Sequence, residues 1–173
     1  MLFGDLEFVV ELDREVFIHE FLVDLHNDPE VLKNLTHPSP ITVEQHMNWW
    51  EKTKNNPSQL RLIFEVDGKC AGFTKFYDID PVNECCVLGA DIHKSHRGKG
   101  LARLMWTLML DKCFNELKLH RVGLTTAEYN VIGQRVYTGL GFKVEGKFTQ
   151  SLFREGKFWD QYVMYMLKED WKP

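Results

Sequence analysis

The order of patterns between positions 84 and 127 limits the possible folds of this chain more than any other feature. A predicted strand, Glu84–Ile92, is followed by a turn with two glycines, by a predicted helix over about Leu101–Leu117 and by a short predicted strand, Arg121–Ala127. Parallel strands need a long crossover such as a helix, whereas a tight turn joins antiparallel strands. The segment therefore predicts a parallel pair of strands within an α/β protein.

Hairpins and further helices surround this unit. Asp67-Gly68 is a strong hairpin turn. The other predicted strands are Leu6–Leu12, Leu60–Val66, Cys70–Tyr77, Phe142–Phe148 and Phe158–Leu167. The other predicted helices are Arg14–Leu25, Thr42–Asn55 and Asn130–Gly139. Together these elements predict one α/β domain over residues 1–173, with a mixed central sheet of about seven strands flanked by helices.

Composition excludes several classes of protein. A hydrophobic fraction of 44% with 27% charged residues is ordinary for a soluble globular chain. The net charge of −4 and the lack of a basic stripe predict no nucleic-acid partner. No apolar run approaches the ~20 residues of a membrane span, and the first residues lack a basic signal region, so we expect a cytoplasmic protein. The four cysteines show no metal-binding spacing and are expected to be reduced core residues.

The stretch Ile92–Ala102 carries the clearest chemical signal. It follows a predicted strand and opens a helix, and Gly98 and Gly100 allow the backbone to approach a ligand closely. Free N–H groups at the helix start favour an anion such as a pyrophosphate. A P-loop would need a hydroxyl residue after Lys99, where Gly100 stands, and a dinucleotide-binding motif would need a third glycine at Arg103. Taken alone, the turn is also compatible with a purely structural role.

Two motifs in order resemble those of the GNAT acetyltransferases. Arg97-Gly98-Lys99-Gly100-Leu101-Ala102 is similar to the family's [Gln/Arg]-x-x-Gly-x-[Gly/Ala] motif, after the correct strand. Asn130-x-x-Gly133-x-x-Val136-Tyr137-x-x-Leu140-Gly141-Phe142 resembles its second motif, with Gly133 where alanine is usual. Asn27-Asp28-Pro29-Glu30-Val31 and the tail from Glu145 to Tyr162 are similar to the branch with ribosomal-protein N-terminal, spermidine and nucleotide-amino-sugar acetyltransferases.

The resemblance implies acetyl-CoA as cosubstrate and no metal. It assigns the pyrophosphate to the turn residues Arg97, Gly98, Lys99, Gly100, Leu101 and Ala102. It places the pantetheine arm between the splayed parallel strands Glu84–Ile92 and Arg121–Ala127, with an N–H near Ile92 as oxyanion donor. Asn130 resembles the residue that contacts this arm, and it is equally suited to cap a helix.

Tyr137 is the candidate general acid that protonates the departing CoA thiolate. Its alternative role is that of a core tyrosine on an amphipathic helix. Many relatives place a glutamate base on the strand before the turn, where Val87 stands here. Asp91 lies on the same predicted strand face, four residues later, and is the candidate base. A structural aspartate at this position is an equal alternative.

The acceptor is less defined by the sequence. His46 and Trp49 are candidate substrate-binding residues, whereas His93 and His96 are expected to be surface histidines and not metal ligands. We expect direct attack, in a ternary complex, by a primary amine of a small molecule, an amino-sugar nucleotide or a polyamine. A protein N-terminus as acceptor and a non-catalytic acyl-CoA-binding module are the alternatives. The assembly state is open, with a homodimer as one option.

Overall fold

The computed structural model describes residues 6–9 and 16–172 of the 173-residue chain. The backbone divides into two compact units, each built from two stretches of sequence. The first unit consists of Met1–Phe76 and Gly89–Leu101, and the second of Tyr77–Leu88 and Ala102–Pro173. The expectation of one domain over residues 1–173 stays a prediction.

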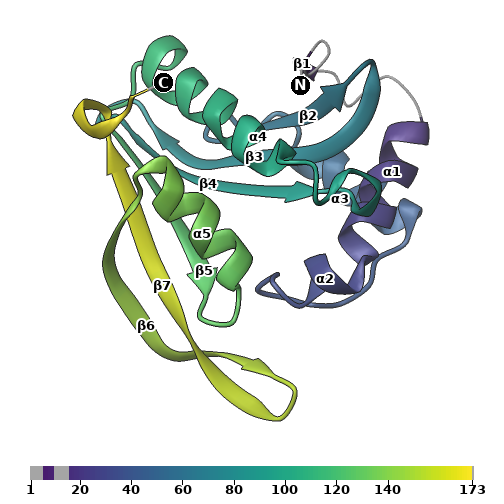
Figure 1. The fold of residues 1–173 in the computed structure, drawn as a ribbon. Helices are drawn as coiled ribbons and strands as arrows, with labels where there is room; N and C mark the ends of the chain where they lie inside the picture. The colour runs from purple at the N-terminus through teal and green to yellow at the C-terminus, as the bar shows by residue number, and fades with distance from the viewer. Residues whose placement is uncertain (1–5, 10–15, 173) are drawn as a thin grey trace. The chain divides into compact units, whose positions relative to one another are not determined.

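The first unit contains an antiparallel group of strands (Figure 1). Strand β2 (Leu60–Val66) pairs with β1 (Leu6–Val9) and with β3 (Lys69–Asp80). Asp67 and Gly68 have φ of +52° and +68°, as the tight turn of a right-twisted hairpin requires, and the predicted hairpin is confirmed. Strand β1 confirms the first four residues of the predicted strand Leu6–Leu12, whose positions 10–12 lie outside the described residues.

Helices of the first unit pack on these strands through a shared apolar core. They are α1 (Val16–Asn27), α2 (Pro29–Leu32) and α3 (Val43–Thr53). The core consists of Ile18, Leu22, Leu25, Val31, Trp50, Ile63 and Phe73. A capping box opens α3, because Thr42 Oγ1 accepts from the Gln45 N–H and Gln45 Oε1 accepts from the Thr42 N–H. Helix α2 was not expected from the sequence, since four residues are too few for a helical pattern.

The second unit contains both parallel and antiparallel pairs. Strand β4 (Cys85–Ile92) pairs in parallel with β5 (Arg121–Ala127), and within the described register this pairing runs from Cys85↔Arg121 to Val87↔Gly123. Strand β7 (Lys157–Leu167) pairs antiparallel with β5 and with β6 (Lys143–Arg154). Strand β6 extends beyond the predicted Phe148, because pairing resumes after an irregularity in its register. Figure 1 shows β6 and β7 as a long hairpin.

Two helices accompany the strands of the second unit. Helix α4 (Leu101–Asp111) ends earlier than predicted and continues as a π-helical segment, η2 (Lys112–Glu116). Cys113 and Phe114 in this segment are both fully buried. Helix α5 (Val131–Leu140) follows β5 and ends at Gly141, which is left-handed. The four cysteines are free thiols, and two of them, Cys86 and Cys113, are buried.

The expected fold class is confirmed. The chain is an α/β protein with a mixed sheet and flanking helices, and the strand–helix–strand crossover from β4 through α4 to β5 joins a parallel pair. No helix within residues 6–9 and 16–172 is long and apolar enough to cross a membrane.

Candidate functional site

The turn between β4 and α4 presents backbone N–H groups at the start of an eleven-residue helix. A short 3₁₀ helix, η1 (Lys94–His96), follows β4, and Gly98 and Gly100 then have φ of +75° and +77°. L side chains rarely adopt this conformation, so both positions favour glycine. A Cβ added at either glycine would meet no atom within 4 Å, so the space beside the turn is open. The first N–H groups of α4, from Leu101 on, lack carbonyl partners in the helix, and the geometry therefore fits an anion such as a pyrophosphate.

The side chain of Arg97 turns back towards the protein at the entrance of this turn. Its Nε donates to the Ile92 carbonyl oxygen (3.0 Å), and its Nη1 donates to Asp28 Oδ1 (3.2 Å). The Arg97 backbone N–H donates to the Lys94 carbonyl oxygen at 3.4 Å. The guanidinium thus links the end of β4 to the start of α2.

Asp28 is a buried carboxylate with two kinds of partner. It is the N-cap of α2, where its Oδ1 accepts from the Glu30 N–H at 2.9 Å, and it is only 8% exposed. Burial alone raises the pKa of this carboxyl. The hydrogen bonds from the Glu30 N–H and from the Arg97 guanidinium outweigh burial, so the pKa of Asp28 lies below its ordinary value.

A second carboxylate, Asp24 of α1, holds η1. Its two oxygens lie 2.8 Å from His93 Nε2 and 2.8 Å from Lys94 Nζ. The hydrogen bonds from Lys94 and His93 lower the pKa of Asp24. Burial, followed by the positive charge of nearby Lys99, lowers the pKa of His96. His93 and His96 both belong to this hydrogen-bonded segment. No group of three or more metal-ligating side chains occurs among the residues that the structure describes.

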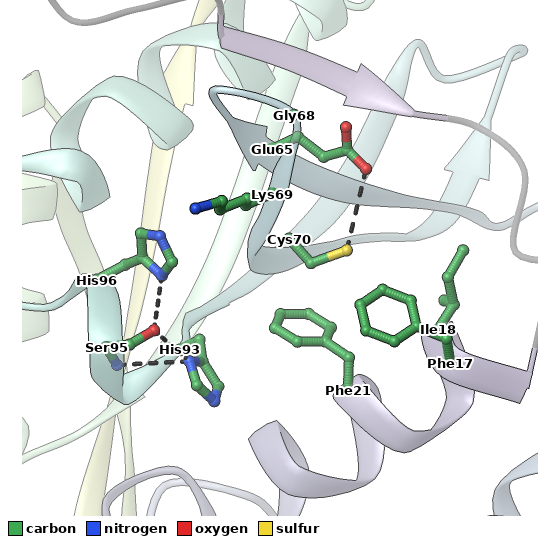
Figure 2. Close-up of a pocket in the computed structure, with 10 residues that line it drawn as sticks. All are labelled: Phe17, Ile18, Phe21, Glu65, Gly68, Lys69, Cys70, His93, Ser95 and His96. Atoms are coloured by element: carbon green, nitrogen blue, oxygen red, sulfur yellow. Dashed lines mark hydrogen bonds between the residues drawn. The ribbon is translucent and has the colours of Figure 1, made fainter.

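A cavity of about 480 Å³ lies beside η1 within the first unit. Figure 2 shows Phe17, Ile18 and Phe21 of α1 on one side of it and His93 and His96 on another. Ser95 of η1 and residues at the tip of the β2–β3 hairpin supply the rest of the lining. This cavity contains none of the candidate catalytic residues.

The end of β4 carries both Asp91 and Ile92. Lys75 Nζ of β3 donates to Asp91 Oδ2 at 2.6 Å, and both side chains are mostly buried. The His93 N–H donates to the Ala71 carbonyl oxygen of β3. Successive N–H groups of a strand point to opposite edges, so the Ile92 N–H points away from β3. With this direction, the Ile92 N–H can donate to a group bound beside the other edge of β4.

Tyr137 lies on α5 in the second unit, and its ring is fixed by other rings. Its centroid is 4.8 Å from that of Trp106 in α4, edge to face, and 6.1 Å from that of Phe142. Trp106 lies four residues, about one helical turn, after Ala102 at the start of α4. The partly exposed Tyr137 ring is therefore held against the first half of α4. Tyr137 was predicted as a general acid, and this role stays a prediction.

Asn130 caps the start of α5. Its Oδ1 accepts from the Gly133 N–H (3.1 Å), and its Nδ2 donates to Thr126 Oγ1 (3.2 Å). A Cβ at Gly133 would lie only 2.5 Å from Asn130 Nδ2, so alanine at this position would require the folded-over amide to shift. The capping alternative is thus present, and contact with a pantetheine arm stays a prediction. Tyr137 lies seven residues later, on the same face of α5.

His46 and Trp49 of α3 belong to a cluster with His19 of α1 and Arg61 of β2. His46 Nδ1 lies 2.9 Å from Nδ1 of His19 in α1, and both histidines are buried. The Trp49 ring is 5.3 Å from His46, and the Arg61 guanidinium lies 4.6 Å above it. Burial, together with the charges of His19, His26 and Arg61, lowers the pKa of His46 to about 4. A buried, paired histidine is better suited to packing than to substrate contact, while Trp49 is 40% exposed.

The structure brings the sequence-predicted residues together in groups. In the first unit, Asp91 to Leu101 form one continuous segment, and in the second, Ala102, Asn130 and Tyr137 share the α4–α5 region. Sequence reasoning missed the roles of Asp28 and Lys75. Asp28-Pro29 has the form of a helix start, which could have identified the cap. Nothing local points to a partner as distant as Arg97.

Comparison with known proteins agrees with this arrangement. Residues 8–143 match the sequence model of the acetyltransferase (GNAT) domain. An L-amino acid N-acetyltransferase of Escherichia coli is 27% identical over 156 residues, which is 87% of this chain and 92% of that protein. The E. coli spermidine N(1)-acetyltransferase is 29% identical over 109 residues, 63% of this chain and 59% of that protein. A crystal structure of spermidine N-acetyltransferase from Vibrio cholerae with CoA and spermine has a TM-score of 0.88 at 23% identity, covering 95% and 96% of the two chains, and this likeness is one of fold.

A glycine turn that opens a helix after a parallel strand, together with the match over most of the chain, defines an acyltransferase that uses an acyl-CoA. The chain belongs to the GNAT acetyltransferase family, and it is an acetyl-CoA-dependent N-acetyltransferase.

Proposed function

We propose that the protein transfers the acetyl group of acetyl-CoA directly to a primary amine of a small molecule. This small molecule is either an amino-sugar nucleotide or a polyamine. The single observation that carries the donor half is the left-handed pair Gly98 and Gly100 before α4. These glycines leave the backbone open to a phosphate group, and the N–H groups from Gly98 to Ala102 are its donors. Acetyl-CoA supplies the activated acetyl group when bound there.

The Ile92 N–H is the proposed donor to the carbonyl oxygen of the acetyl group. A fixed donor aimed at developing negative charge is usually the largest single contribution to catalysis of acyl transfer. The direction of this N–H, away from β3, supports the assignment because the neighbouring His93 N–H is the one used by β3.

Tyr137 is the proposed general acid. A phenol can donate a proton to the departing thiolate and regain it from solvent. The edge-to-face contact with Trp106 supports the role, because it limits the positions that the ring can take. Tyr137 and Asn130 share one face of α5, as a common ligand would require.

Asp91 is the proposed base, and its ion pair defines how it would act. The Lys75 ammonium occupies Oδ2 of the carboxylate. A protonated amine would have to compete with Lys75, so we expect Asp91 to accept the proton through a water molecule. An alkyl amine with an ordinary pKa near 10.4 is mostly protonated at pH 7, so some acceptor for this proton is needed.

A small amine is preferred to a protein terminus as acceptor on two grounds. The net charge of −4 favours accumulation of a cation near the protein. The relatives named for spermidine and for L-amino acids acetylate, by their names, small amines. Both grounds concern the class of acceptor and leave its identity to experiment.

A panel of acceptors tests the proposal. Release of CoA thiol is measured with spermidine, spermine, L-amino acids, a nucleotide-linked amino sugar and a peptide with a free N-terminus. We expect turnover above background hydrolysis with at least one small amine and little with the peptide. Turnover with the peptide alone would replace the proposal by N-terminal acetylation. Binding of acetyl-CoA without turnover on any amine would indicate a non-catalytic module.

A further inference from the structure

We propose that Asp28 is a positioning residue for acetyl-CoA, and that it acts through Arg97 on the turn that binds the pyrophosphate. The inference rests on the proposed function, since it takes the turn from Gly98 to Ala102 as the donor site. Asp28 touches neither the turn's backbone nor any group of the proposed chemistry. Its only link to the turn, among the described contacts, is the Arg97 guanidinium.

The turn needs support from outside itself. Gly98 and Gly100 have no neighbouring atoms within 4 Å of a Cβ position, and both are exposed. Glycines lose more conformational freedom on ordering than other residues, so an unsupported pair would have to be ordered at the expense of ligand affinity. Arg97 directly precedes the two glycines, so a fixed Arg97 conformation has the greatest effect on how well the turn is ordered.

Arg97 provides this support in two directions. Nε binds the carbonyl oxygen of Ile92, and Nη1 binds Asp28, which lies 69 residues earlier in the chain. A guanidinium is planar, so two simultaneous bonds fix its orientation and restrict the backbone that carries it. Asp28 is only 8% exposed, and hydrogen bonds from the Glu30 N–H and the Arg97 guanidinium hold its pKa below the ordinary value despite burial, so the carboxylate that faces Arg97 is charged at neutral pH.

Asp28 lies in a hydrogen-bonded segment that connects to the start of α3. The neighbouring Asn27 makes two hydrogen bonds of 2.8 Å with the backbone of Ile41, one as donor and one as acceptor. Asp28 also caps α2 through the Glu30 N–H. Residues 27 and 28 thus connect the start of α2 to Ile41, which precedes Thr42, the N-cap of α3. The Asp28–Arg97 ion pair joins the glycine turn to this segment.

The alternative is that the Arg97 side chain binds a phosphate directly and that Asp28 merely restrains it. The two roles predict opposite effects of removing the Asp28 charge. If Arg97 is a ligand, its release leaves acetyl-CoA affinity unchanged or increases it. If Arg97 is a brace, its release loosens the turn and weakens affinity.

The test is the variant Asp28→Asn, because asparagine caps helices as well as aspartate does and removes only the charge. We expect the Kd and KM for acetyl-CoA to rise about tenfold, the size typical of coupling through a positioning contact. The kcat at saturating acetyl-CoA and the KM for the amine should stay within about twofold. The exposed Glu30→Gln, which removes a charge from the same short helix, is the matched control and should behave as wild type. A general structural defect would instead lower kcat and the melting temperature together.

A double-mutant cycle with Arg97→Gln isolates the pair. The double variant should bind acetyl-CoA no more weakly than Arg97→Gln alone, and Arg97→Lys, which keeps the charge but loses the two-point contact, should resemble Asp28→Asn. Additive losses, or unchanged affinity in Asp28→Asn, would overturn the inference while leaving the proposed function intact. If Asp28→Asn does not fold, Arg97→Lys with near-native acetyl-CoA affinity overturns it. Wild-type protein that fails to bind acetyl-CoA would instead refute the proposed function itself.

Discussion

Tyr137 is the single residue on which the proposed chemistry depends most directly. Its ring is held by Trp106 and Phe142, so its packing and its hydroxyl can be separated by mutation. The contrast with His46 is informative. His46 is buried against His19, and its environment disfavours the charged form. The Tyr137 side chain is thus partly exposed, whereas the His46 side chain is buried.

Replacement of Tyr137 by phenylalanine should keep the ring contacts and remove only the proton donor. We expect kcat to fall by roughly 10²- to 10⁴-fold, the usual contribution of general acid–base catalysis, with acetyl-CoA affinity nearly unchanged. Steady-state kinetics with saturating acetyl-CoA measures this. Tyr165→Phe on β7 is the control and should keep wild-type turnover. Near-native turnover of Tyr137→Phe would mean that water or another group protonates the thiolate.

His46 should make stability depend on pH. Its pKa of about 4 in the folded protein is below the ordinary 6.5, so the unfolded chain binds more protons in this window. The contribution of neutral His46 to the free energy of unfolding is fully present above pH 6.5. It is lost as the pH falls through 4, and the loss amounts to about 3 kcal/mol at most. Urea unfolding between pH 7 and pH 4 should show a shallower loss for His46→Gln than for wild type. His37→Gln, at an exposed position, is the control, and equal slopes for His46→Gln and wild type would contradict the account.

The β4–α4 turn is the element to which we assign donor binding. Its two left-handed glycines, its exposed backbone and the helix that follows are local features. The brace from α2 is a long-range feature. Together they describe a turn whose shape comes from its own glycines and whose fixed position comes from elsewhere in the first unit.

Valine at position 100 should abolish or strongly weaken acetyl-CoA binding while the fold persists. Its Cβ and a φ of +77° are poorly compatible, so the backbone must change just where the pyrophosphate approaches. Gly156→Val is the control, because Gly156 has a similar φ of +73° in the β6–β7 turn. Calorimetric titration with acetyl-CoA should give wild-type affinity for Gly156→Val only. Unchanged affinity in a folded Gly100→Val protein would remove the turn from the donor site.

Local patterns predicted most elements, and long-range contacts account for what was missed. Asp67-Gly68 predicted its hairpin and Arg121–Ala127 matches β5, because turn residues and apolar runs act over short distances. The π-helical end of α4 and the extension of β6 depend on packing and on pairing with β7. The Asp28–Arg97 pair could not be predicted, since no local pattern connects residues 69 positions apart.

For the molecule as a whole, the donor site is better defined than the acceptor site. The donor turn is one continuous segment, whereas of the two candidates for acceptor contact His46 is buried and Trp49 is 40% exposed. Relatives named for spermidine and for L-amino acids show that this family accommodates different amines. Membership of the GNAT family identifies acetyl-CoA as the cosubstrate, and the fold alone does not identify the acceptor.

Direct transfer of the acetyl group to an amine is tested most simply by following a labelled acetyl group. Acetyl-CoA labelled in the acetyl group is mixed with the protein, with and without the best amine of the panel, and protein and small molecules are analysed by mass spectrometry. We expect the label on the amine, free CoA in equal amount, and an unchanged protein mass when the amine is left out. A labelled protein in the absence of amine would show a covalent acetyl-enzyme, and label retained in acetyl-CoA with every amine would contradict acetyl transfer altogether.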